Sequence, residues 1–194
     1  MRLKTCLTLF LVLALLLGPG CGPHRLASPG GVTLKPADYL EASYRASDFD
    51  PEQVSFILEP FTLERTQGVA PDIFQTLLQK ELAKALADNG LSTTPSEEQP
   101  PCTLTGTVEK VQVWGSRFRW LIGKISGELK VYGTIRRGEE VLFAFQDRIH
   151  LVSPLTPGPA PPKEAELLLQ QVVHIFATHL VNELLLQGVA PEGG

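Results

Sequence analysis

The sequence predicts an α+β two-layer sandwich: a four-stranded, mostly antiparallel sheet with two helices on one face, in the order β-α-β-β-β-α. Three stretches between residues 102 and 145 alternate apolar and polar side chains, which is the period of a strand covered on one side only. Residues 71–88 and 163–187 instead carry apolar side chains at helical spacing. The 194 residues are 43% hydrophobic and 20% charged, which indicates about one globular domain and excludes a wholly disordered chain.

The first strand and the first helix come before this alternating region. Residues 53–59 (Q-V-S-F-I-L-E) are rich in β-branched and aromatic side chains, as a largely buried strand is. Pro71 and Asp72 suit the first turn of the helix that follows, because proline fits that turn and an acidic side chain complements its positive end. Asn89 and Gly90 are typical of a left-handed helix end.

In the other three strands, the alternation predicts which side chains lie on each face of the sheet. In the first of them the alternation changes phase near Glu109 and Lys110, which predicts a β-bulge there. A tight hairpin at Gly138 joins the second strand to the third. Gly127 and Gly133 fall on the core face, where small residues let the long final helix approach the sheet. The rest of that face is predicted to hold Cys102 as a buried inert thiol together with Leu104, Val108, Val111, Val113, Ile125, Leu129, Val131, Ile135, Val141, Phe143 and Phe145.

The opposite face of the sheet is predicted to be polar. Lys130, Tyr132, Thr134 and Arg136 lie on it from one strand, and Gln146 and Arg148 from the next. Such a face is either plainly solvated or a docking surface for a partner sheet or subunit.

The first 20 residues have the layout of a secretory signal peptide. Arg2 and Lys4 give a positive start, and the apolar run Cys6–Leu17, at about 18 Å as a helix, is too short to cross a bilayer core of about 30 Å. The run ends at Gly20-Cys21, which resembles the lipobox of bacterial lipoproteins. In that family the cysteine is lipidated and becomes the mature N-terminus. An ordinary cysteine behind a soluble-protein cleavage site and an uncleaved anchor remain as alternatives.

The resemblance to lipoproteins implies a domain organisation and a location. Residues 1–20 are the signal peptide, 21–51 the lipidated Cys21 with a Pro- and Gly-rich tether or docked arm, 52–188 a single α/β domain and 189–194 a tail. Gly22 follows the cysteine, and in lipoprotein sorting the absence of Asp at that position implies the inner leaflet of the outer membrane, facing the periplasm. The lipid anchor would hold the protein on this membrane.

A second resemblance lies in residues 115–123 (G-S-R-F-R-W-L-I-G). They are similar to the Gly-Ser-Arg…Arg-aromatic…Gly signature of an uncharacterised bacterial lipoprotein family, the domain-of-unknown-function family 4410. The order of elements also resembles the N-terminal domain of TolB. Both resemblances imply an envelope protein, and neither implies an established activity.

The same segment supplies the candidate binding residues Trp114, Arg117, Arg119 and Trp120. Residues two apart on an extended chain share a face, so Arg117 and Arg119 can meet one anionic group between aromatic side chains. In the alternative interpretation the segment folds over the end of the sheet, and its arginines pair with acids such as Glu109 or Glu128.

Other chemistry is weakly represented. His179 and Glu183 have helical i, i+4 spacing but make only half of a metal site, so no metal and no cofactor are expected. No catalytic motif is present, and a net charge of −4 argues against nucleic-acid binding. The sequence therefore predicts a non-enzymatic interaction or assembly module with an envelope protein partner. The alternatives are a protein that binds a small anionic ligand or lipid through Arg117 and Arg119 and, more remotely, a hydrolase.

Overall fold

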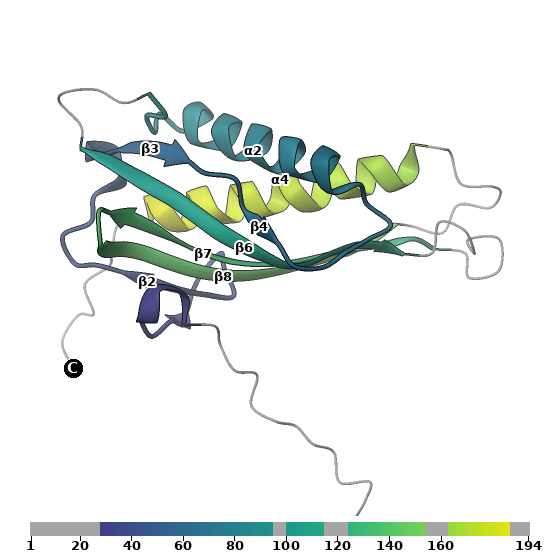
Figure 1. Ribbon diagram of the computed structural model, residues 1–194, viewed down its shortest axis with the longest axis horizontal. Coiled ribbons are helices and arrows are strands. Elements are labelled where there is room, and N and C mark those ends of the chain that lie inside the picture. The colour runs from purple at the N-terminus through teal and green to yellow at the C-terminus, as the bar shows by residue number, and fades with distance from the viewer. Residues whose placement is uncertain (1–27, 95–99, 115–123, 154–162, 187–194) are drawn as a thin grey trace, which may run out of the picture.

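The computed structural model describes residues 28–94, 100–114, 124–153 and 163–186. Two α-helices and eight strands form these parts of the chain, together with two short 3-10 helices, η1 and η2 (Figure 1). In chain order the elements are η1 (Pro29–Gly31), β1 (Lys35–Pro36), β2 (Ala42–Arg45), η2 (Pro51–Gln53), β3 (Ser55–Leu58), β4 (Thr62–Leu63), β5 (Thr66–Gln67), α2 (Pro71–Asp88), β6 (Pro101–Trp114), β7 (Ser126–Arg137), β8 (Glu140–Val152) and α4 (Glu164–Leu185).

The eight strands form one mixed sheet with the order β1-β2-β8-β7-β6-β3, and β4 and β5 also pair with β6. The prediction of a four-stranded sheet is therefore wrong, although the α+β character is shared. Two kinds of strand were missed. β2 pairs with β8, which is far away in the sequence, and β1, β4 and β5 have only two residues each. Such short strands arise from backbone pairing and leave no period in the sequence.

The antiparallel meander β6-β7-β8 is the part that the alternation predicted. Its residues pair in register along both junctions, and the register shifts between Val108 and Lys110, which confirms the predicted bulge. After the shift, Val111 and Val113 remain on the buried side. β3 runs parallel to β6 and makes the sheet mixed.

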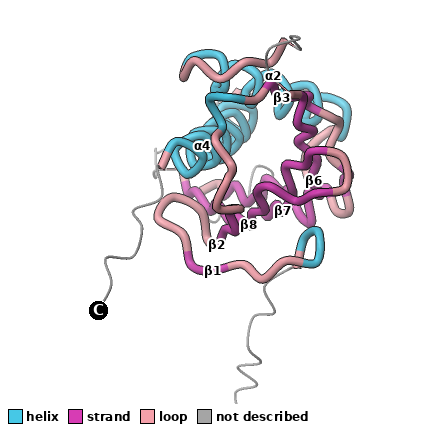
Figure 2. Tube along the Cα trace, turned by 90° about the vertical axis from the view of Figure 1, so that its left-hand side faces the viewer, coloured by secondary structure: helices cyan, strands magenta, loops and turns pink. Residues whose placement is uncertain are grey.

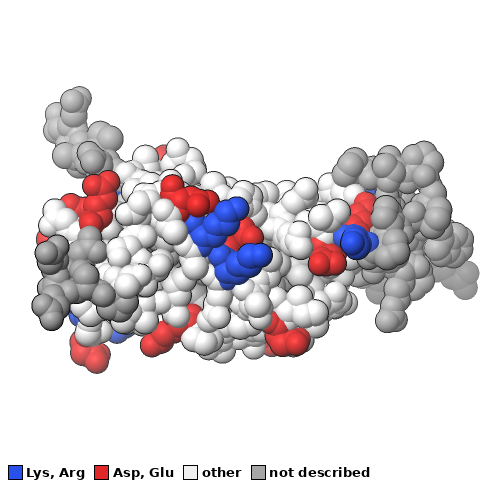
Figure 3. All heavy atoms as spheres, turned by 90° about the horizontal axis from the view of Figure 1, so that it is seen from above, with Lys and Arg blue, Asp and Glu red and all other residues white. Residues whose placement is uncertain are grey.

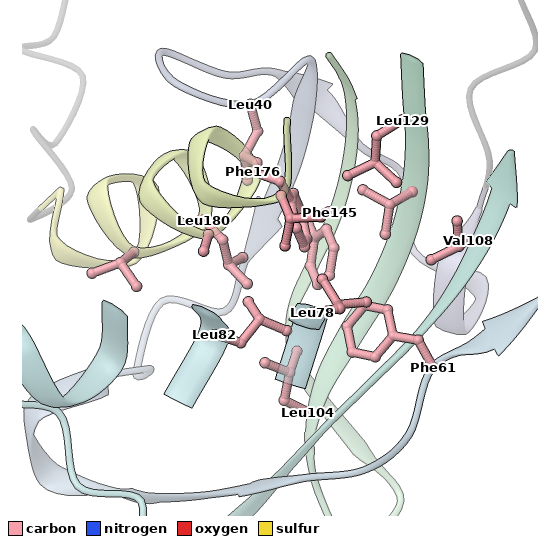
Figure 4. Packing of buried hydrophobic residues seen from close by; sticks show 14 of the residues in the cluster. Leu40, Phe61, Leu78, Leu82, Leu104, Val108, Leu129, Phe145, Phe176 and Leu180 are labelled. Atoms are coloured by element: carbon pink, nitrogen blue, oxygen red, sulfur yellow. The ribbon is translucent and has the colours of Figure 1, made fainter. Parts of the chain in front are cut away.

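Both helices lie on one face of the sheet, and the main core fills the space between (Figures 1 and 4). Leu78 and Leu82 of α2 and Phe176 of α4 are fully buried there. The ring of Phe176 lies 5.8 Å from that of Phe145 on β8, within the range of favourable aromatic pairs. Neither described helix is long and apolar enough to cross a membrane.

The two core-face glycines make room for different neighbours. A Cβ at Gly127 would meet Leu168 and Val172 of α4 at 3.1 Å, which confirms that the helix approaches the sheet closely there. A Cβ at Gly133 would lie 2.3 Å from the carbonyl oxygen of Thr105 and 2.6 Å from the Phe145 ring. The expectation that Gly133 accommodates the helix is therefore wrong, because this glycine makes room for β6 and a phenylalanine.

The stretch before β3 is an arm that packs on both faces of the sheet. Leu40 and Phe49 are buried in the main core, whereas Leu34 and Ala42 join Ala144 in a small second cluster. η1 contacts β7 and β8 on the face away from the helices (Figures 1 and 2). The arm therefore begins on the open face, by which we mean the face opposite α2 and α4, and passes around the edge of the sheet.

Candidate functional site

Of the predicted binding residues, the described part of the chain contains Trp114. It is the last residue of β6, it is 46% exposed, and its neighbours across the strands are Ser126 of β7 and, beyond that, Val152 of β8. Because Val113 points into the core, Trp114 points to the open face. Cys21, Arg117, Arg119 and Trp120 lie outside the described residues.

Both acids named as possible partners of those arginines bind other cations. Glu128 accepts a hydrogen bond from Lys110 Nζ at 2.7 Å and one from Arg148 at 3.0 Å. Glu109 lies 3.4 Å from Arg65 and 3.7 Å from Lys130. The two carboxylates thus join three strands and the β4–β5 segment on the open face.

Glu128 is held in its charged form. Desolvation by burial raises the pKa of this carboxyl, but the hydrogen bond and positive charge of Lys110, with those of Arg148, outweigh burial and leave its pKa below the ordinary value. Glu128 is therefore a buried anion between two cations that reach solvent.

Three cations lie side by side on the open face. Lys110, Lys130 and Arg148 are directly opposite one another on β6, β7 and β8, and we call them the basic row. Like charges directly opposite each other destabilise a sheet, so this arrangement has an energetic cost that Glu128 and Glu109 offset only in part. A groove of about 620 Å³ adjoins the row at Lys110 and continues past Arg65.

The arm divides the open face in two. Near the hairpin, η1 covers it, and Gly30 lies against Thr134, Arg136 and Val141. Thr134, which was predicted to lie on an exposed polar face, is buried. The other half, which no other described segment covers, holds the basic row and Trp114.

The helix side also carries charges of both signs. Figure 3 shows Lys and Arg side chains lying beside Asp and Glu side chains there, with uncharged surface over most of the visible remainder.

A second polar cluster joins the arm to α4. His179 Nδ1 lies 2.9 Å from Asp147 Oδ2, and Glu183 accepts hydrogen bonds from the Tyr39 N–H at 2.9 Å and the Ser43 hydroxyl at 3.0 Å. Burial is the main cause that raises the pKa of Asp147, and the hydrogen bond from His179 opposes it. His179 and Glu183, the half metal site of the sequence, thus bind the sheet and the arm, and no group of three metal-ligating side chains occurs in the described ranges.

Arg45 completes this junction at the end of α4. Its guanidinium donates hydrogen bonds to the carbonyl oxygens of Leu184 and Leu186 and lies 5.5 Å from the Phe49 ring centre. These are the free carbonyls of a helix C-terminus, where a cation is favourable. Desolvation lowers the pKa of Arg45, and Asp50 and Glu183 oppose that effect.

A cavity of about 780 Å³ lies beside this junction, between the arm, β2, Phe143 and the end of α4. Its deeper charged groups, Arg45 and Glu183, already bind protein atoms, whereas Lys35 and Asp38 line it from the arm. The polar groups of this cavity therefore serve mainly to hold the arm against α4.

Cys102 on β6 is buried as predicted, and burial raises the pKa of its thiol.

The sequence did not reveal these clusters. Glu128 and Asp147 lie 18 to 32 residues from their partners along the chain. Strand register brings Glu128 to its cations, and the packing of α4 on the sheet brings His179 to Asp147. The alternation in the sequence assigns Lys130 and Arg148 to one face of the sheet. It does not give the register between strands, which is what places Lys110 directly opposite Lys130.

Comparisons with known proteins support the fold. No family model and no curated protein matches the chain, so membership in family 4410 is not confirmed. The chain is similar to the crystal structure of protein XCC0632 from Xanthomonas campestris, which is described by the family model DUF330. The two superpose with a TM-score of 0.50 and 8% sequence identity, over 71% of this chain and 86% of that one. At this identity the likeness shows a shared fold alone.

Two other solved structures are similar to the chain at lower TM-scores. One is a minor lipoprotein from Acinetobacter baumannii, with a TM-score of 0.40 and 14% identity over 63% of this chain and 88% of that chain. The other is a PelC dodecamer from Paraburkholderia phytofirmans, with a TM-score of 0.40 and 9% identity over 76% of this chain and 95% of that chain.

Proposed function

We propose that the protein is a lipid-anchored envelope lipoprotein that faces the periplasm from the outer membrane and acts as a non-enzymatic interaction module. The observation that carries this proposal is the sequence of the leader: a positive start, a short apolar run and Cys21 directly after a glycine. Solved structures described as lipoproteins are among those similar to the chain.

The arm supports an anchoring role for the N-terminus. Only the short stretch 22–27 separates Cys21 from the first described residue, and from there the arm packs on the sheet and is latched to α4 by Glu183 and Arg45. An anchor at Cys21 would therefore hold the folded domain on a short connection.

The buried charges support a structural rather than a catalytic use. Asp147 binds His179, Glu183 binds the arm, and Glu128 binds two cations. Each of these carboxylates is used in joining elements of the fold, so each stabilises the domain that a partner would recognise.

The anchor is tested by the intact mass of the mature protein purified from a native membrane. We expect the mass of residues 21–194 plus three acyl chains, and loss of this acylated species in the Cys21→Ser variant. Cys6→Ser, in the leader, is the matched control and should leave acylation unchanged. An unacylated mature chain that diffuses freely would overturn the proposal.

The interaction role is tested by purification from a detergent-solubilised envelope. A partner recovered at a fixed ratio is the expected outcome. Recovery of the protein alone at high yield would contradict an assembly role.

A second candidate function is binding of a small anionic ligand by Arg117 and Arg119. The observation that favours it is Trp114, which lies exposed three residues before Arg117. Titration calorimetry with glycerol 3-phosphate tests it. The double variant Arg117→Gln/Arg119→Gln should lose binding, whereas Lys80→Gln/Lys84→Gln, which removes the same charge from α2, should retain it. Absence of heat in the parent protein would remove this candidate.

A further inference from the structure

The cations of the basic row reach solvent, whereas Glu128, the carboxylate between two of them, is buried. The side chains of Lys110, Lys130 and Arg148 are 33%, 30% and 47% exposed, whereas that of Glu128 is 9% exposed. Arg65 and Glu109, with side chains 70% and 38% exposed, border the row, and Glu64 adjoins it through a contact of 3.5 Å with the Tyr132 hydroxyl. A row of like charges in a sheet costs stability, and an anionic surface on the open face would offset that cost.

Trp114 extends the same face toward the end of the sheet. Lys110, Gln112 and Trp114 alternate outward on β6, so Trp114 lies about 13 Å along the strand from the basic row. Val152, on the strand beyond β7, is also exposed. Tryptophan favours the boundary between lipid head groups and acyl chains, and long cationic side chains reach the phosphates there.

The first element of the described chain, η1, lies on this face as well. η1 lies on the open side of β7 and β8, and Ser28 precedes it (Figure 1). The seven residue steps from Cys21 to Ser28 span at most about 25 Å. Along β7, the basic row at Lys130 is about 20 Å from Arg136, which lies beside Gly30. An anchor at Cys21 can therefore reach the same surface that the basic row would touch.

We propose that the open face of the sheet is the membrane-facing surface of this protein, and that the basic row and Trp114 dock on anionic phospholipid head groups. This inference rests on the proposed lipid anchor and adds the orientation of the domain on its membrane. It leaves α2 and the outer side of α4 directed away from the bilayer.

The test uses the full chain reconstituted into vesicles of phosphatidylglycerol and phosphatidylcholine, or of phosphatidylcholine alone. The chain has two tryptophans, so Trp120→Phe leaves Trp114 as the sole reporter. Lipids brominated on the acyl chains quench a tryptophan that lies at the head-group boundary. We expect strong quenching of Trp114 in the anionic vesicles and a large loss of quenching in phosphatidylcholine or at high salt.

Charge variants in the same background identify the surface. Lys130→Gln/Arg148→Gln leaves Glu128 paired with Lys110 and should reduce the ratio of docked to undocked protein about 25-fold, at about fivefold per cation. Lys80→Gln/Lys84→Gln on α2 is the matched control and should change it less than twofold. Lys130→Gln alone, with about a fivefold reduction, replaces the double variant if thermal melting shows that the double variant is unfolded.

Three results would overturn the orientation: Trp114 unquenched in anionic vesicles, equal quenching in both lipid compositions, or equal effects of the basic-row and α2 variants. The chain is held on the vesicle by either its acyl chains or its apolar leader. Failure of this test is therefore distinct from failure of the anchor, which the mass of the mature protein reports.

Discussion

Two buried carboxylates on opposite faces of the sheet behave in opposite ways. Glu128 on the open face is 7% exposed and Asp147 on the helix-covered face is 4% exposed, yet the pKa of Glu128 is lowered and that of Asp147 is raised. Their neighbours explain the difference. Glu128 lies between Lys110 and Arg148, whereas Asp147 is desolvated by burial and accepts hydrogen bonds from one histidine and from the Arg148 N–H. The covered face is thus stabilised by packing, and the open face by charge.

The largest loss of stability is expected from a variant that removes packing on the helix-covered face. Phe176→Ala deletes a fully buried ring against Phe145 and should lower the free energy of unfolding by about 3–5 kcal/mol. Leu167→Ala on the same helix is the control, because Leu167 is 55% exposed and its truncation should cost less than about 0.5 kcal/mol. Urea unfolding measures both. Equal losses in the two variants would show that packing under α4 does not dominate this face.

A smaller effect is expected where the arm meets the covered face. Glu183→Ala leaves the Tyr39 N–H and the Ser43 hydroxyl without their acceptor, which should cost about 1–3 kcal/mol. Hydrogen exchange should become faster in residues 38–45 before it does so in the β6-β7-β8 meander. Glu166→Ala, an exposed acid on the same helix, is the control. Unchanged exchange in the arm would show that Glu183 does not latch it.

The two faces also differ in how far the sequence predicts them. Alternation identified the strands of the meander and even the bulge between Val108 and Lys110, because a half-covered strand leaves a period of two. It did not identify β2, whose four residues pair with the distant Phe143–Gln146. The basic row was missed for the same reason, since its existence depends on register between strands. Long-range backbone pairing has no local signal, and the arm and the open face are both built by it.

The smallest expected effect tests the comparison of the two carboxylates directly. The pKa of Glu128 is below its ordinary 4.5, so its ionisation stabilises the fold above pH 4.5, and this contribution is lost as the pH falls through the folded-state pKa. The pKa of Asp147 is above its ordinary 3.8, so its contribution is present below pH 3.8 and is lost as the pH rises through the folded-state pKa.

Urea unfolding between pH 3 and pH 7 should therefore give slopes of opposite sign for the two positions. The stability of the parent protein relative to Glu128→Gln should increase as the pH rises, because the folded state prefers the ionised Glu128. Its stability relative to Asp147→Asn should decrease over the same change, because the folded state prefers the protonated Asp147. The amides keep the shape of each side chain and remove the titration, so each variant is the control for the other. Slopes of the same sign would mean that the two cations beside Glu128 and the burial of Asp147 do not set the proton affinities of these carboxylates.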